Sequence, residues 1–128
     1  MSTLKISTLS NLAGSQSTAV ENAIQGSAKA WVNFNGTGTV AIRASYNVSS
    51  ITDNGTGDYT VNFTNALTDA NYSVVVSVGT IIAGTGGYFG QIGAGASGST
   101  MTTSAVKVDC RTASAYTDTD VVCVSIFR

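Results

Sequence analysis

The stretch Ala28–Phe63, AKAWVNFNGTGTVAIRASYNVSSITDNGTGDYTVNF, decides the fold. Its first segment, 28–35, alternates small or apolar residues with Lys, Trp and Asn, and a period of two is typical of a strand with one dry and one wet face. The same alternation returns at Tyr59–Phe63. Asn-Gly follows the first segment at Asn35 and precedes the last at Asn54, and Asn-Gly between alternating runs indicates a β-hairpin because its turn requires positive φ. We therefore predict antiparallel strands joined by glycine turns, with Val40 and Ile42 continuing the dry face.

Three further strands follow this stretch. Asn71–Val78 is valine-rich, which predicts burial on both sides. Thr103–Arg111 alternates, with Val106, Val108 and Cys110 inward and Lys107, Asp109 and Arg111 outward. Val121–Phe127 is apolar at both parities and is expected either at the centre of a sheet or against another subunit. The prediction is an all-β fold, an antiparallel, jelly-roll-like β-sandwich of about seven to nine strands over residues 28–128.

Residues 1–27 differ from the rest and predict an N-terminal attachment arm. Thr18–Glu21 fits a capping box, so a short helix is expected to begin there and to end at Gly26. A helix of at most two turns persists only by docking, and a disordered leader is the alternative reading. The arm residues expected to make contacts are Leu4, Ile6, Leu9, Val20 and Ile24.

Charge is sparse: charged residues are 10% of the chain, and the net charge is −1. Lys and Arg are scattered singly, so the stripe that nucleic-acid binding requires is missing. No apolar run is long enough to insert into a membrane, and the N-terminus lacks the apolar core of a signal peptide. So weakly charged a surface favours assembly, in which copies of the chain cover one another.

The segment AKAWVNFNGTGTVAIRASYNVSSITDNGTGDYTVNFTNALTDANYSVVVS, together with the opening Met1–Ile6, resembles a segment of tail-fibre-like and other virion structural proteins of tailed, particularly marine, bacteriophages. The resemblance implies a non-enzymatic, homotrimeric virion component, assembled in the cytoplasm of a host bacterium. The expected function is that of a short tail fibre or tail-associated appendage that contributes to host attachment. Its partners would be copies of itself, other virion proteins and a glycan or protein of the host surface. A capsid decoration or head-fibre protein, and a free carbohydrate-binding module, are the alternatives.

The candidate receptor-facing residues are aromatic and amide side chains near glycine. Tyr88, Phe89 and Gln91 lie in the glycine-rich stretch Gly79–Ser99, and Tyr116 lies in the last loop. Exposed aromatic side chains on loops suit recognition, whereas two edge strands with buried aromatic side chains are the alternative. Gly93–Gly98 has the letters of a dinucleotide fingerprint, but strand signals follow it rather than a helix, so no cofactor is predicted.

Two cysteines lie in the last two predicted strands. If these strands form a hairpin centred between Tyr116 and Thr117, then Cys110 and Cys123 face each other and a cross-strand disulfide is possible. Two reduced cysteines acting as small hydrophobes are the alternative, which folding in a cytoplasm favours.

Catalytic chemistry has little support. The chain contains no histidine, the usual general base. A glycosidase would require paired carboxylates, for which Asp118 and Asp120 are candidates, but aspartates of turns and loops explain the same letters. Asp53–Asp58 offers oxygen ligands for calcium without the alternating spacing of a known calcium loop. We expect no catalytic residue, cofactor or metal.

Overall fold

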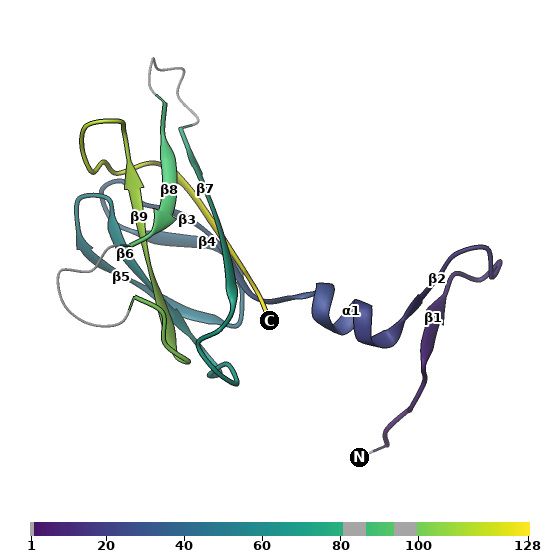
Figure 1. Ribbon diagram of the computed structural model, residues 1–128. Helices are drawn as coiled ribbons and strands as arrows, with labels where there is room; N and C mark the ends of the chain where they lie inside the picture. The colour runs from purple at the N-terminus through teal and green to yellow at the C-terminus, as the bar shows by residue number, and fades with distance from the viewer. Residues whose placement is uncertain (1, 81–86, 94–99) are drawn as a thin grey trace.

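The computed structural model describes residues 2–80, 87–93 and 100–128. Two parts of the predicted glycine-rich stretch, 81–86 and 94–99, therefore lie outside the described residues. From residue 28 onward the chain forms a β-sandwich, and the preceding residues form an arm that extends to one side (Figure 1). The predicted all-β sandwich is confirmed.

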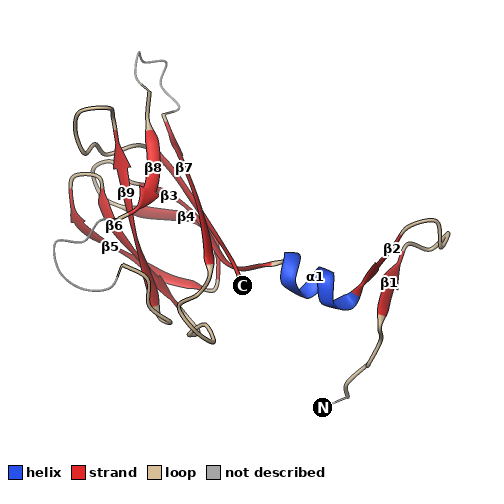
Figure 2. Cartoon of the chain, viewed as in Figure 1, coloured by secondary structure: helices blue, strands red, loops and turns tan. Residues whose placement is uncertain are grey.

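Two four-stranded antiparallel sheets make up the sandwich (Figure 2). One sheet has the order β4-β3-β10-β7 and the other the order β5-β6-β9-β8. In chain order the elements are β1 (Thr8–Ser10), β2 (Ser17–Ala19), α1 (Val20–Gly26), β3 (Ala28–Asn35), β4 (Ala41–Tyr46), β5 (Val48–Gly55), β6 (Asp58–Phe63), β7 (Ser73–Gly79), β8 (Phe89–Ile92), β9 (Ala105–Arg111) and β10 (Val121–Phe127).

The core lies between the inward faces of the two sheets, as the alternation predicts. Phe34 of β3 and Tyr59 of β6 are fully buried, and their rings meet edge to face with centroids 5.2 Å apart. Each large apolar side chain buried in this way contributes roughly 1.5–3 kcal/mol. The remaining core side chains are Ala30, Val32, Val48, Val61, Phe63, Tyr72, Val106, Val108, Cys110, Val122, Val124 and Ile126.

Both predicted hairpins are present. β3 pairs with β4 and β5 pairs with β6, and each connection contains glycine at positive φ. Gly57 has φ 65°, and a Cβ atom there would lie 2.7 Å from the backbone nitrogen of Thr117. The turn between β5 and β6 therefore requires glycine for two reasons, its φ and its close approach to another loop.

β4 is an edge strand, and all six of its residues are exposed. The expected continuation of the dry face holds only in part. Val40, which precedes the strand, packs against the core, whereas Ile42 is 38% exposed. A register shift at Asn33–Phe34 of β3 interrupts the pairing opposite Arg43.

The predicted double burial of the valine strand is wrong. β7 is the other edge of the same sheet, and only its inward residues pack against the core. Val75 points outward and is 54% exposed. Repeated valine indicates a strand, but it does not show whether a second layer covers the outer face.

The predicted capping box is also wrong. Thr18 belongs to β2, and the helix is capped at Ala19 without a side-chain hydrogen bond. The helix does end at Gly26, as expected. The extended hairpin β1–β2 runs directly into α1, so Thr18 pairs with Leu9 instead of turning toward the helix amides.

The predicted hairpin of the last two strands is wrong, and with it the facing cysteines. β9 and β10 lie in different sheets, because residues 112–120 cross from one layer to the other. Cys110 points into the core, whereas Cys123 lies on the outer face of β10, and both are free thiols. The two cysteines are therefore not cross-strand partners in one hairpin, as the disulfide interpretation assumed.

The sandwich has two distinct ends. At the arm end, β3 begins and β10 finishes. At the distal end lie the end of β3, the β5–β6 turn, the start of β8 and the crossover 112–120. Backbone hydrogen bonds from Gly36 N–H to Thr119 O (2.9 Å) and from Thr117 N–H to Cys110 O (3.0 Å) join the distal loops. The arm is thus attached at the end opposite to these loops (Figure 1).

Candidate functional site

The arm presents apolar side chains that nothing on its own sandwich covers. Leu4 is 82% exposed and Ile24 is 58% exposed. Ile6 and Leu9 are each 45% exposed, and Val20 is half-buried. Leu12, at the tip of the β1–β2 hairpin, is fully exposed and was not among the arm residues predicted from the sequence. These leucines and isoleucines are exposed along the arm, where another molecule could contact them.

At the distal end, the structure gathers three of the four candidate receptor-facing residues. Phe89 of β8 is the cross-strand partner of Arg111 in β9, and Arg111 forms a bridge with Tyr116 in the crossover. Gln91 is the partner of Asp109, one pair further along the same face. Because directly paired residues share a face, Phe89 and Arg111 point the same way. We call Phe89, Arg111 and Tyr116 the aromatic–arginine row.

Arg111 is the centre of this row. Its guanidinium carbon lies 4.5 Å from the centroid of the Tyr116 ring, which is cation–π geometry. Its Nε is buried and has no hydrogen-bond partner in the part of the chain that the structure describes. The sequence interpretation placed Arg111 outward but assigned it no role, because the row joins three segments that are not adjacent in sequence.

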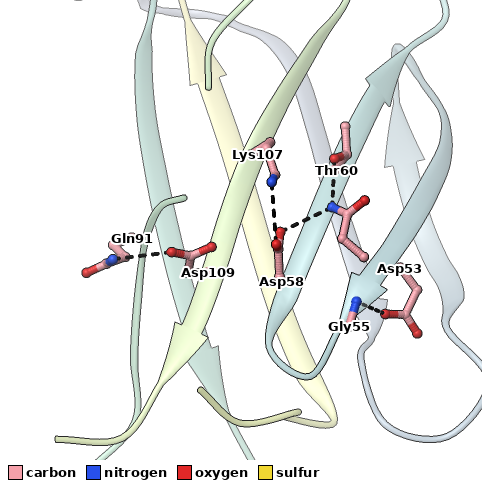
Figure 3. Close-up of polar contacts among 8 residues, drawn as sticks. Asp53, Gly55, Asp58, Thr60, Gln91, Lys107 and Asp109 are labelled. Atoms are coloured by element: carbon pink, nitrogen blue, oxygen red, sulfur yellow. Dashed lines mark hydrogen bonds and ion pairs between the residues drawn. The ribbon is translucent and has the colours of Figure 1, made fainter. Parts of the chain in front are cut away.

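A polar array continues the same face beside the row (Figure 3). Gln91 Nε2 donates to Asp109 Oδ2 at 3.4 Å, and Lys107 Nζ pairs with Asp58 Oδ2 at 3.4 Å. Asn54 donates to Asp58 Oδ1 at 3.1 Å. Asp109 is buried, whereas the Lys107–Asp58 pair is partly exposed and contributes little stability. Together these contacts place hydrogen-bond donors and acceptors side by side.

The crossover that carries Tyr116 is held by Asp118. Its Oδ1 accepts hydrogen bonds from Gly57 N–H and from the Tyr59 hydroxyl, both at 2.7 Å. Burial, and then the hydrogen bond to Asp118, raise the pKa of Tyr59 well above its ordinary value, so this phenol remains a donor. Asp118, one of the two carboxylates considered for catalysis, therefore has a clear structural role.

Tyr88 lies apart from the row. It lines a cavity of about 190 Å³ with Thr37, Thr80 and residues 118–120. The structure therefore does not bring it together with Phe89 and Gln91, although the three are close in sequence. Tyr88 precedes β8, which begins at Phe89.

The carboxylates considered for calcium have protein partners. Asp53 Oδ1 accepts the Gly55 N–H at 3.0 Å, and Asp58 is bound by Asn54 and Lys107 (Figure 3). Within residues 2–80, 87–93 and 100–128, no group of three metal-ligating side chains is found.

The two outer faces of the sandwich differ. The β5-β6-β9-β8 face carries the polar array. The β4-β3-β10-β7 face carries a cross-strand row of Tyr46, Trp31, Ser125 and Val75. Trp31 is 39% and Tyr46 59% exposed, and among the residues of this row none is charged. We call this row the apolar face.

No helix among the described residues has the length and apolar character needed to cross a membrane. Comparison with models of protein families, with curated proteins and with solved structures finds no match to this chain.

Proposed function

We propose that the chain is a non-enzymatic structural protein of a virion, a short tail fibre or tail-associated appendage that contributes to host attachment. The observation that carries the proposal is the separation of two surfaces. An apolar arm leaves one end of the sandwich, and the aromatic–arginine row lies at the other. The resemblance of Ala28–Ser77 to tail-fibre-like proteins supports the same reading.

Assembly into a homotrimer is part of the proposal. The apolar face exposes Trp31, Tyr46 and Val75, and neighbouring copies that packed on this face would bury these side chains. Covering this face with neighbouring copies would remove those side chains from water, while the arm remains available to bind another virion protein.

The first experiment measures mass in solution. The full chain is expected to sediment as a trimer, and the double variant Trp31→Lys/Val75→Lys as a monomer, because two buried charges would disfavour the interface. Ser114→Lys, in the exposed crossover, adds a charge away from this face and should remain trimeric. A monomeric full chain at micromolar concentration would contradict the assembly.

The second experiment tests the arm. Virions assembled with a chain lacking residues 2–27 are expected to lose this protein, whereas Ser114→Lys should be incorporated. Incorporation without the arm would defeat the attachment role.

A capsid decoration or head-fibre protein is the second candidate, since an apolar arm could equally grip a shell. Labelling the protein in intact particles separates the two positions, because a tail label supports the appendage and a head label the decoration protein.

A further inference from the structure

We propose that the aromatic–arginine row, with Gln91 beside it, binds a neutral saccharide. This inference rests on the proposed function, because it names the ligand class of the distal end. It adds that the ligand carries hydroxyl groups and no net charge.

The row supplies two kinds of contact. Phe89 is 42% and Tyr116 40% exposed, so both rings retain area that a ligand can cover. Aromatic rings provide large contact areas with little loss of conformational entropy. A sugar ring presents C–H groups on its faces and hydroxyl groups at its edge, so it can use the aromatic area and the polar array together.

Arg111 supplies hydrogen-bond donors that the protein does not use. Its Nε lacks a partner, and among the described residues it forms no ion pair. A guanidinium presents five N–H donors in a planar fork. Because Nε is buried, a pair of neighbouring hydroxyl groups would accept from the terminal Nη groups of this fork, and the amide of Gln91 both donates and accepts next to it.

The surrounding charges favour a neutral ligand over an acidic one. Asp109 lies two residues from Arg111 on the same face, and the crossover that holds Tyr116 also carries Asp118 and Asp120. Lys107 is already paired with Asp58. Asp109 is buried and Asp118 accepts hydrogen bonds from Gly57 and Tyr59, but both carboxylates keep their negative charge. Three carboxylates against Arg111 give this end a net negative charge, which disfavours an anionic ligand.

An extended peptide fits this surface less well. β8, the edge strand next to the row, is only four residues long, and strand addition draws its affinity from repeated main-chain hydrogen bonds. The contact area of the row is also confined to two rings separated by one guanidinium.

The test uses the full chain and affinity electrophoresis through gels that contain dextran, mannan or galactan as neutral polymers, or polygalacturonate as an acidic one. At least one neutral polymer is expected to retard the chain, and polygalacturonate is not. Phe89→Ala, Tyr116→Ala and Arg111→Gln should each weaken the retardation about tenfold, as loss of a central contact does.

Three matched variants sharpen the result. Arg111→Lys keeps the charge but loses the planar fork, so it should bind as weakly as Arg111→Gln. Tyr116→Phe keeps the ring and should retain binding. Ile42→Ala removes a partly exposed apolar side chain from β4, outside both the aromatic–arginine row and the apolar face, and should bind as the unmodified chain does.

Several results would overturn the inference: no retardation by any neutral polymer, equal or stronger retardation by polygalacturonate, unchanged binding by the row variants, or an equal loss in Ile42→Ala. If the row variants lost binding to a protein partner and the chain bound no saccharide, the inference would also be overturned. Saccharide binding is measured apart from mass and virion incorporation. Its failure and that of the proposed function are therefore distinguishable.

Discussion

At the level of single residues, the distal end depends on one tightly packed turn. Gly57 donates its N–H to Asp118, and its carbonyl accepts the N–H of Cys110 at 2.8 Å. The backbone of Thr117 passes so close that a side chain at Gly57 has no room. One glycine thus joins the β5–β6 turn, β9 and the crossover.

Gly57→Ala is expected to destabilise the protein more than Gly38→Ala does. Both positions have positive φ, 65° and 61°, but a Cβ at Gly38 would meet no atom within 4 Å. The difference between the two losses of unfolding free energy therefore measures the steric crowding at Gly57, for which we expect about 1–3 kcal/mol. Denaturant unfolding of the two variants measures it, and equal losses would contradict the close packing.

Cys110 predicts a loss of stability in alkaline solution. Burial is the largest influence on this thiol and raises its pKa from 9.0 to about 11. Below pH 9 both the folded and unfolded chains keep the proton. Between pH 9 and 11 the unfolded chain releases it while the folded chain retains it, so stability falls with rising pH by roughly 1.4 kcal/mol per unit.

Unfolding free energies measured from pH 8 to 10 test this prediction. Cys110→Ala should show a shallower decline than the unmodified chain, whereas Cys123→Ala, which keeps the buried thiol, should show the same decline. Identical slopes in all three chains would rule out the assigned cause. The raised pKa of Tyr59 acts in the same direction, but only above pH 10, where an unfolded tyrosine loses its proton.

At the level of strands, the crossover gives the two cysteines opposite environments. Cys110 is fully buried, whereas Cys123 is half-buried on the outer face of β10. A thiol reagent is expected to modify one cysteine in the native monomeric variant Trp31→Lys/Val75→Lys and the second only after unfolding. In the assembled chain, coverage of the outer face should slow modification of Cys123. Two rapidly reacting thiols in the native protein would contradict this arrangement.

Local patterns in the sequence predicted the strands and the two glycine hairpins correctly. In 28–35 and 59–63 the period of two identifies the inward face, because adjacent residues settle the direction of each side chain. Neither the alternation in 105–111 nor the apolar run 121–127 says which sheet each strand joins. The crossover was therefore taken for a hairpin, and the cysteines were wrongly paired.

The candidate site was predictable only in part. Phe89, Gln91 and Tyr116 were chosen for their chemistry and local setting, and they do lie on one surface. Arg111 could not be chosen, because its role depends on the register of β8 against β9 and on the path of the crossover. Both are long-range features that a local pattern does not encode.

At the level of the whole molecule, the arm and the sandwich are distinct in packing. The sandwich core contains no residue before Ala30, and α1 has no buried residue. A chain lacking residues 2–27 is therefore expected to unfold with a free energy within about 0.5 kcal/mol of the full chain, as for exposed surface changes. Thermal and denaturant unfolding check this, and a large loss would show that the arm packs against the sandwich.

The exposed edge strand β4 affects how the protein behaves during storage in solution. The unpaired backbone groups of an exposed edge strand can pair with the edge strand of another chain and start aggregation. Natural proteins commonly prevent this with a β-bulge and a charged side chain on the edge. In this protein the charged side chain is Arg43, which lies at the register shift between β4 and β3. Its guanidinium donates to Asn33 Oδ1 at 3.3 Å. Arg43→Val is expected to shorten the storage life of concentrated samples, as light scattering over days would record, whereas Arg43→Lys should preserve it.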